Sequence, residues 1–410
     1  MDEPGGRSRG GDHLITRAAE ADPAIMVGAV GVLLGGSWAA TYALGGSQSV
    51  GPQLFHVPVI LAAARFSYVG GLVSGVLAGI LCGPLMPLDV TDDLDQSFAS
   101  WFVRLVLFVL IGEMVAALQS RSLATARRRL DDAAVRRQHA EALAAGLFTP
   151  VYQPIVELAT GRVVGVEALA RLGNGAGAVV LPAEFIPDAE RTGSVVDIDD
   201  AILGAACRQL AKWDADGTVA EDFHLAVNLS ACGLDDPTLV ERVAGHLDAA
   251  GIAPHRLVLE LTETSLASDS ELAMKKLVAL RELGVGIALD DFGVGQSSLS
   301  SLGQFPIDRF KIDRTFTVEV TTGPREATFV GTVIRLAEAL ALDDPIAEGV
   351  ETAEQHVALI AAGARWGQGF LFGVPLPADA IEAVLRAGRV EIAIEGADLE
   401  EGLSGVEGGA

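Results

Sequence analysis

Basic side chains are scarce in this chain of 410 residues: 29 lysines and arginines stand against 54 acidic residues, for a formal net charge of −25. A chain this acidic is not a nucleic-acid binder held by phosphate contacts. Aromatic residues make up only 5%, and the three cysteines, Cys82, Cys207 and Cys232, lie far apart. Their odd number and wide spacing argue against a disulfide framework and against a cysteine-based zinc site.

Charge is almost absent from one long region of the chain. Half of all residues are hydrophobic and the mean hydropathy is +0.39, which excludes a disordered or wholly soluble protein. Residues 24–118 carry only seven charged side chains, and we predict a transmembrane region of about four helices there. Four are favoured over three, because a single helix over 54–87 would be about half again longer than the bilayer is thick. The expected helical stretches are 24–46, 54–66, 68–87 and 98–118.

Arginines gather on one side of these stretches. The loop 45–53 is uncharged and the loop 87–97 is acidic, so the positive-inside rule predicts that both ends of the chain lie in the cytoplasm. Residues 1–23 would then form a cytoplasmic N-terminal segment of a multi-pass protein of the cytoplasmic membrane. The arginines on the expected inner side are Arg7, Arg9, Arg17, Arg65, Arg121, Arg127, Arg128, Arg129, Arg136 and Arg137.

Two ionisable residues, Arg104 and Glu113, lie within the last apolar stretch. Because an ionisable group in lipid is costly, they are candidates for binding a ligand or sensing a proton. The alternative is that Arg104 extends to the outer interface while Glu113 faces a neighbouring helix near the inner one.

Residues 119–146 predict a basic helical connector that continues out of the membrane and ends at Gly146. It is open to two interpretations: a dimeric signalling helix, since Leu123 and Leu130 are seven residues apart, or a solvated stalk lying against anionic lipid. At the other end of the chain, residues 390–410 are acidic and rich in glycine, which predicts a disordered tail.

The region 147–389 alternates short apolar runs with amphipathic helical patterns. This repetition predicts a parallel α/β fold, and eight runs indicate a (β/α)8 TIM-like barrel. The connection 158–163 is too short for a helix and indicates a hairpin, so one strand should be antiparallel. The expected strands are 149–158, 163–171, 223–230, 256–264, 286–292, 309–314, 345–350 and 366–372, and the expected helices are 197–215, 237–250, 270–284, 324–341, 352–363 and 378–388.

Polar residues recur at the C-terminal ends of these runs, which in such a barrel converge on one mouth. Several carboxylates there would repel one another unless cations bound them, and oxygen ligands select Mg²⁺ or Mn²⁺ over zinc. A tandem aspartate suits two ions about 4 Å apart, an arrangement used for displacement at phosphorus. Lys311 would orient or deprotonate the attacking water, or stabilise transition-state charge. The residues are Glu167, Asn228, Glu260, Asp290, Asp291, Lys311, Glu348 and Gln368.

The sequence around these positions resembles the EAL domain of bacterial cyclic-di-GMP phosphodiesterases over residues 148–388. The name motif stands as Glu167–Ala168–Leu169, followed by Arg171 after Ala170. The resemblance implies an EAL-type barrel that opens cyclic di-GMP to linear pGpG with two divalent cations, Mg²⁺ or Mn²⁺. The other matching segments, in order, are YQPI, FIPDAERTG, AVNLSA, ELTE, LDDFGVGQSSL, FKIDR, AEGVET and QGFLFGVPLP.

The resemblance also assigns a role to each matching position. Lys311 would position the nucleophilic water, Gln368 would support the water and metal site, and Glu263 would hold the loop after the tandem aspartate. Glu348 would take part in catalysis as well as in metal binding. The implied metal ligands are Glu167, Asn228, Glu260, Asp290, Asp291 and Glu348. The implied substrate contacts are Gln153, Leu169, Arg171, Asp313 and Pro375.

One segment departs from the family pattern, because Val294 and Gln296 replace the usual threonine and tyrosine of the loop after the tandem aspartate. That loop links metal binding to dimer contacts in the family, so we expect a homodimer with altered activation. Two alternatives remain: a catalytically silent cyclic-di-GMP receptor, and a metal-dependent lyase or enolase-type barrel with Lys311 as base. The short connector leads us to expect no cyclase (GGDEF) domain, and nothing suggests a DNA or RNA polymer as partner.

Overall fold

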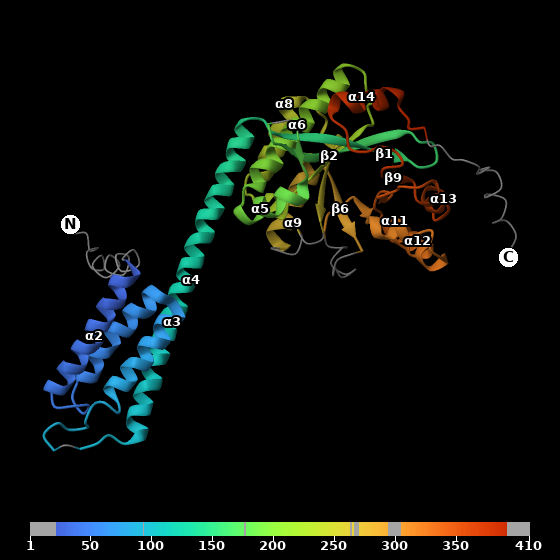
Figure 1. The fold of residues 1–410 in the computed structure, drawn as a ribbon. Coiled ribbons are helices and arrows are strands. Elements are labelled where there is room, and N and C mark those ends of the chain that lie inside the picture. The colour runs from blue at the N-terminus through green and yellow to red at the C-terminus, as the bar shows by residue number, and fades with distance from the viewer. Residues whose placement is uncertain are drawn as a thin grey trace. The chain divides into compact units, whose positions relative to one another are not determined.

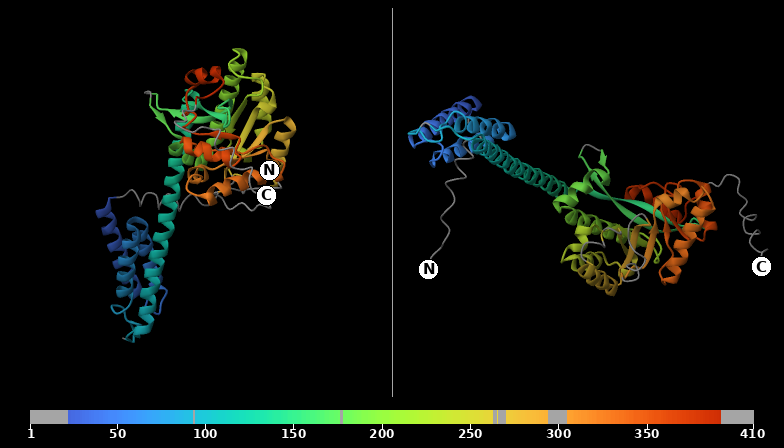
Figure 2. Two further views of the ribbon diagram at one scale, coloured as in Figure 1. Left: turned by 90° about the vertical axis from the view of Figure 1, so that its right-hand side faces the viewer. Right: turned by 90° about the horizontal axis from the view of Figure 1, so that it is seen from below.

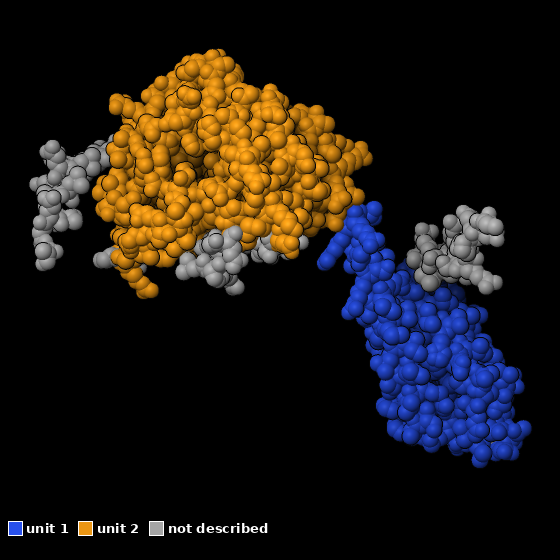
Figure 3. Space-filling model, turned by 180° about the vertical axis from the view of Figure 1, so that it is seen from behind, with its two compact units in different colours: residues 1–131 blue, residues 132–410 orange. Residues whose placement is uncertain are grey.

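The structure of the protein is a computed structural model, drawn as ribbons in Figures 1 and 2, that describes residues 22–92, 94–175, 178–262, 265, 270–293 and 305–391. Glu263, Val294 and Gln296 lie outside the described residues, as do nearly all of the 1–23 segment and of the 390–410 tail. The chain divides into two compact units, residues 1–131 and 132–410 (Figure 3). All three cysteines are free thiols, as expected.

Unit 1 is built from apolar helices: α2 (Pro23–Ala43), the 3-10 helix η1 (Gly51–Phe55), α3 (His56–Cys82) and the first part of α4 (Phe98–Ala144). The Asp22 carboxylate caps α2 by accepting from the Ala24 amide, and Pro23 occupies the first turn, where no amide hydrogen is needed. Among the described residues, three helices are long and apolar enough to cross a membrane: α2, α4 and the helix that runs from η1 through α3.

Helix α3 is divided at Ser67, whose φ of 56° and ψ of −143° are not helical. A Cβ placed on Gly70 would lie 2.2 Å from the carbonyl oxygen of Ala62. In a straight helix, eight residues would separate these positions by about 12 Å. The chain therefore folds back, close to the Arg65 position where the sequence predicts two short helices.

The second half of α3 packs closely against α4 through glycines. A Cβ on Gly71 would lie 2.7 Å from the carbonyl carbon of Gly112, and one on Gly75 would lie 2.8 Å from the Cα of Val109. Small residues allow helices to approach this closely, as is common between membrane helices. Helix α4 then continues without a break to Ala144, so the last apolar stretch and the predicted basic connector form one helix.

Unit 2 is a closed barrel of eight strands with one additional short strand, β3. Strand β1 closes the barrel by pairing antiparallel with both β2 and β9, while the remaining barrel strands pair parallel to their neighbours. The predicted barrel with one antiparallel strand is confirmed. The strands are β1 (Phe148–Glu157), β2 (Val163–Gly173), β3 (Val179–Val180), β4 (His224–Asn228), β5 (Leu257–Thr262), β6 (Gly286–Phe292), β7 (Arg309–Ile312), β8 (Ile346–Ala347) and β9 (Trp366–Gln368).

Helices surround this sheet and bury a continuous core that includes Tyr152 and Trp213, whose rings meet edge to face at 4.9 Å. The six helices predicted from the sequence are present within about two residues, whereas α5, α7 and α11 were not predicted. The helices are α5 (Pro182–Thr192), α6 (Val195–Ala215), α7 (Ala231–Asp235), α8 (Leu239–Ala250), α9 (Ser270–Leu283), α11 (Arg314–Glu319), α12 (Pro324–Ala339), α13 (Ala353–Ala361) and α14 (Ala378–Ala387).

Candidate active site

The polar residues predicted at the strand ends lie together at one mouth of the barrel. Strand register shows why: Asn228 at the end of β4 lies opposite Glu260 of β5, and Thr262 at the end of β5 lies opposite Asp290 of β6. Glu348 directly follows β8, and Gln368 is the last residue of β9. Because parallel strands end on the same side of a sheet, alternate side chains of successive strands converge there.

Lys311 of β7 is the centre of this cluster. Its side chain is fully buried, and its ammonium nitrogen lies 2.6 Å from an oxygen of Glu260 and 2.6 Å from an oxygen of Glu348. Oxygens of Glu167 and Asp290 follow at 3.3 and 3.5 Å. Burial alone would lower the pKa of Lys311, but the surrounding carboxylates outweigh it and raise this pKa well above its usual value. The lysine is therefore a buried cation.

Glu167 is held by three donors. Its Oε1 accepts from the Asn228 amide at 2.6 Å, and its Oε2 accepts from the Gln368 amide at 2.7 Å and from Lys311. Burial opposes its ionisation, yet the charge of Lys311 and the amide hydrogen bonds outweigh burial and lower the pKa of Glu167. Burial raises the pKa of Glu260 well above its usual value, and the neighbouring Glu167 charge adds to this. The site therefore holds Glu167 ionised and disfavours the charge on Glu260.

Asp290, Asp291 and Glu348 form a second group, in which one oxygen of each lies within 4.8 Å of the others. Burial raises the pKa of Glu348 to about 7, against the charge of Lys311. Burial also raises the pKa of Asp291, and the charge of Asp290 adds to it. This excess of hard oxygen donors is the set that Mg²⁺ and Mn²⁺ prefer.

Two buried oxygens in the described part of the site have no hydrogen-bond partner: Oε1 of Glu260 and Oε1 of Gln368. An unpaired buried acceptor is unfavourable, and a bound cation is the simplest group that would satisfy it. The residues of the mouth therefore fit divalent cations: Asn228 adjoins Glu167 and Glu260, and Asp290 groups with Asp291 and Glu348.

Asp291 has a strained backbone, with a φ of 57°. A left-handed conformation of this kind costs about 1–3 kcal/mol for a residue other than glycine. We expect Asp291→Gly to be about 1–2 kcal/mol more stable to urea than Asp291→Ala, because both remove the carboxylate and only glycine relieves the strain. Tryptophan fluorescence during unfolding measures the difference, and equal stabilities of the two variants would contradict the argument.

A cavity of about 400 Å³ opens beside the acidic cluster. Glu167, Asn228 and Asp290 line one side of it, and Leu169 contributes from β2. The rest is largely apolar, and much of it comes from α5 and α6. The residues that line it from these two helices are Pro182, Ile186, Glu190, Val195, Ile198, Asp199 and Ile202.

The residues predicted to contact substrate have different surroundings. Leu169 lines the cavity, and the buried Gln153 accepts from the Gln368 amide at 3.1 Å. Asp313 caps α11 by accepting from the Thr315 amide at 2.8 Å. The described lining of the cavity does not include Arg171, whose guanidinium donates to the Ala170 carbonyl, or Pro375, which follows β9.

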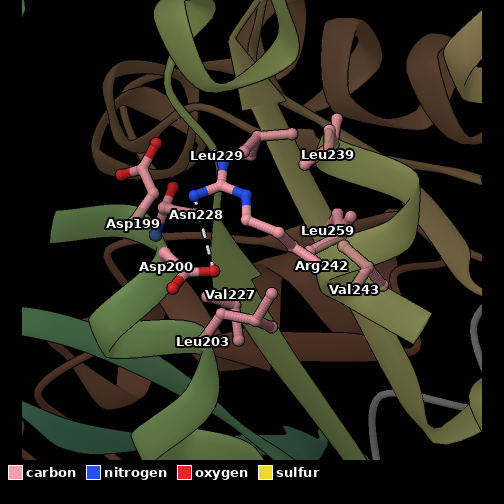
Figure 4. A pocket seen from close by; sticks show the side chains of 10 residues that line it. All are labelled: Asp199, Asp200, Leu203, Val227, Asn228, Leu229, Leu239, Arg242, Val243 and Leu259. Carbon is pink, nitrogen blue, oxygen red and sulfur yellow. Dashed lines mark ion pairs between the residues drawn. The ribbon is translucent and has the colours of Figure 1, made fainter. Parts of the chain in front are cut away.

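Asp199 is a residue of this region that sequence reasoning did not single out. Its Oδ2 accepts from the amide and from the hydroxyl of Ser230, at 3.0 and 2.6 Å, and so fixes the turn that follows Asn228. On the neighbouring Asp200, the carboxylate pairs with Arg242 of α8 at 3.4 Å (Figure 4). An acidic residue in an amphipathic helix usually faces solvent, so no sequence signal distinguishes Asp199 from Asp200.

Burial raises the pKa of Asp199 from 3.8 to about 6, against the hydrogen bonds from Ser230 and the charge of Arg242. A raised carboxyl pKa contributes stability that is complete below about pH 4 and is lost as the pH rises through 6. We expect the free energy of unfolding of Asp199→Asn, measured relative to that of wild type, to rise by up to about 3 kcal/mol between pH 4 and pH 7.5. Urea unfolding at both pH values measures this, and a difference independent of pH would contradict it.

The family model described as EAL domain matches residues 136–375, which is more than half of the chain. The chain belongs to the EAL domain family. Its EAL domain is 40% identical over 232 residues to MucR of Pseudomonas aeruginosa, a bifunctional diguanylate cyclase/cyclic di-GMP phosphodiesterase, covering 57% of this chain and 33% of MucR.

Other relatives agree with this assignment. The cyclic di-GMP phosphodiesterase NbdA of Pseudomonas aeruginosa is 39% identical over 242 residues, covering 59% of this chain and 30% of NbdA. The chain thus spans about a third of the length of these curated relatives. Among solved structures, the PaMucR phosphodiesterase in complex with c-di-GMP is 37% identical with a TM-score of 0.56, covering 60% of this chain and 99% of that one. The EAL domain of DcpA from Mycobacterium smegmatis is 32% identical with a TM-score of 0.51, at 60% and 99% coverage.

Proposed function

We propose that this protein is a membrane-anchored phosphodiesterase that hydrolyses cyclic di-GMP to linear pGpG. The observation that carries the proposal is the cluster of four carboxylates around one buried lysine, with Asn228 and Asp291 adjoining it, beside a cavity of about 400 Å³. The relatives named for cyclic-di-GMP hydrolysis, and the solved complex with this dinucleotide, support the choice of substrate.

Two divalent cations, Mg²⁺ or Mn²⁺, belong to the proposal. Asp290 belongs to both groups of donors, because its carboxylate lies 3.5 Å from the Lys311 ammonium and groups with Asp291 and Glu348. Bound ions would polarise the phosphodiester and make water a better nucleophile near neutral pH. The proposed ligands are Glu167, Asn228, Glu260, Asp290, Asp291 and Glu348.

Lys311 and Gln368 would act on the attacking water. Lys311 donates from the centre of the cluster and Gln368 reaches the same carboxylate, Glu167, so both lie where a water at the mouth would be oriented. The oxygen of this water attacks phosphorus, the bond from phosphorus to the 3′ oxygen breaks, and that oxygen takes up a proton. The buried positive charge of Lys311 would stabilise the charge that develops at phosphorus.

The substrate would extend from the acidic mouth into the cavity. Leu169 and the isoleucines of α5 and α6 give apolar surface of the kind on which a purine ring packs. Arg171 would face a phosphate, because the planar guanidinium fork matches two phosphate oxygens. Gln153, Asp313 and Pro375 complete the proposed substrate contacts, and Glu263 would hold the loop after Asp291.

The proposed membrane topology places the arginine-rich end of unit 1 on the cytoplasmic side. The hydroxyl of Tyr68 lies 3.4 Å from that of Ser120, so the turn after Arg65 lies beside the part of α4 that begins the series of arginines at Arg121. The opposite end holds the acidic loop with Asp89, Asp92 and Asp95. This asymmetry supports both chain ends in the cytoplasm and a location in the bacterial inner membrane.

A homodimer is also part of the proposal. Leu123 and Leu130 are seven residues apart on α4 and are 54% and 72% exposed. Paired helices bury apolar residues at this spacing, although two positions make a short seam. Crosslinking of cysteines introduced at position 123 would test the pairing in membranes.

Product analysis tests the proposed function. The detergent-solubilised full chain, supplied with cyclic di-GMP and Mg²⁺ or Mn²⁺, should release pGpG, and EDTA should stop the release. Binding of the dinucleotide without cleavage would favour the alternative of a catalytically silent receptor that signals through its membrane helices. Cleavage of other cyclic dinucleotides at the same rate would contradict the substrate assignment.

A further inference from the structure

The last turns of α4 carry one buried face. Residues 121–131 are exposed, whereas in the segment 132–144 the buried or half-buried side chains recur every three or four residues, with Leu143 adjacent to Ala142. That spacing defines one side of a helix. The residues on this face are Asp132, Val135, His139, Ala142 and Leu143. We call the segment 132–144 the connector clasp, and in Figure 1 it runs beside α5 and α6.

A chain of hydrogen bonds joins the clasp to the turn between α5 and α6. The hydroxyl of Thr192 donates to the Asp188 carbonyl at 2.8 Å. The hydroxyl oxygen of Ser194 lies 2.9 Å from the hydroxyl oxygen of Thr192. Because the Thr192 proton is committed, Ser194 donates to Thr192 and accepts from Nδ1 of His139 at 2.7 Å. Only 4% of His139 is exposed, so this donor has no ready replacement from water.

An ion pair and a ring contact complete the junction. Arg191 of α5 pairs with Asp132 of the clasp and with Asp188 of its own helix. The His139 ring also meets the Phe148 ring edge to face, with centroids 6.0 Å apart. Burial lowers the pKa of His139 more than the Asp188 charge raises it, which favours the neutral imidazole.

The opposite side of α5 forms part of the cavity wall. Pro182, Ile186 and Glu190 are four residues apart and line the cavity beside the acidic mouth. Arg191 and Thr192, at the end of the same helix, face the clasp. Helix α5 has only eleven residues and contains Pro187, which removes one internal hydrogen bond, so its position depends on its neighbours.

We propose that the connector clasp positions α5 against the nucleotide cavity, with His139 as the positioning residue. The inference rests on the proposed function and extends it to the control of substrate affinity. Neither His139 nor Asp132 touches the oxygen cluster around Lys311, so loosening the clasp changes the cavity wall and leaves the chemistry intact. Since α4 begins at Phe98 in unit 1, a signal that displaces this helix reaches the substrate wall before it reaches the metal ligands.

Three substitutions in the full chain in lipid nanodiscs separate a positioning role from a general loss of structure. His139→Phe keeps the ring but removes the donor, and we expect KM to rise about five- to tenfold with kcat within twofold of wild type, as for the loss of one buried hydrogen bond. His139→Asn restores a donor near the Nδ1 position and should return KM to within about twofold. Arg137→Ala, on the exposed side of the same helix, is the matched control and should change neither constant.

Hydrogen exchange provides a readout that does not depend on activity. The amides of residues 183–192 should exchange faster in His139→Phe than in wild type, while those of β4 and β5 should not change. If His139→Phe fails to fold, Asp132→Asn takes its place, because it removes the ion pair to Arg191. We again expect KM to rise and the amides of α5 to exchange faster.

These measurements distinguish a failure of the connector-clasp proposal from a failure of the proposed hydrolytic function. Unchanged KM and unchanged exchange in α5, or a fall in kcat alone, would overturn the clasp while leaving the hydrolytic function in place. A wild-type chain without any hydrolysis would overturn the proposed function, and α5 exchange would then still decide whether His139 positions this helix.

Discussion

Glu167→Gln is expected to lower the turnover of cyclic di-GMP by at least about a thousandfold, equivalent to about 4 kcal/mol of transition-state stabilisation. Both carboxylate oxygens of Glu167 accept hydrogen bonds, from Asn228 on one side and from Gln368 and Lys311 on the other. In the variant, an amide NH₂ group replaces one of these oxygens and faces a neighbouring hydrogen-bond donor in place of an acceptor. The substitution also removes the negative charge that favours metal binding. Rates of pGpG release with saturating Mg²⁺ measure the effect.

The matched control is Glu157→Gln at the opposite end of the barrel. Glu157 lies opposite Trp366, the first residue of β9, and so lies at the N-terminal end of the parallel strands. Glu167 instead lies in the cluster at the C-terminal ends of these strands. Glu157 makes ion pairs with Arg162 and Arg365. This variant removes a carboxylate of the same kind from the same sheet without touching the mouth, so its turnover should stay within about twofold of wild type. Substantial hydrolysis by Glu167→Gln, within about tenfold of wild type, would contradict the role of Glu167 as a metal ligand.

The site was predictable because its chemistry coincides with a structural pattern. Apolar runs specify buried strands, and the polar residue that ends each run marks the barrel mouth whatever the details of packing. Glu260 in ELTE and Asp290 in LDDF were found in this way, and strand register brings them together. Strand β8 has only two residues, yet its run 345–350 could still be recognised because the apolar signal extends beyond the ladder.

Other features depend on tertiary contacts that no local pattern encodes. Helix α5 contains Pro187, which weakens the helical signal, and its position depends on the cavity and the connector clasp. Helix α11 has six residues and begins at an Asp313 cap, so it is too short for a periodicity to appear. The four carboxylates around Lys311 come from four different strands or strand ends, so its ion pairs follow from barrel closure and not from the FKIDR motif.

Lys311→Met is expected to lower the free energy of unfolding of the metal-free protein by about 3–5 kcal/mol, the usual effect of removing one partner from a buried ion pair. The carboxylates of Glu167, Glu260, Glu348 and Asp290 would lose the cation that lies between them. Urea unfolding in EDTA, followed by tryptophan fluorescence, measures the loss. Lys275→Met is the control, because the Lys275–Glu271 pair is exposed and pairs of this kind contribute at most about 1 kcal/mol.

Magnesium should then stabilise Lys311→Met more than it stabilises wild type. In the wild-type protein the ammonium group and the proposed ions would interact with the same carboxylates, whereas in the variant the ions would supply the missing positive charge. Saturating Mg²⁺ should therefore recover much of the lost stability without restoring hydrolysis, because the residue proposed to orient water is absent. Equal stabilisation of both proteins by Mg²⁺ would mean that the ions bind elsewhere, whereas full activity of the variant would remove Lys311 from the mechanism. The two measurements thus separate the electrostatic role of the lysine from its part in the chemistry.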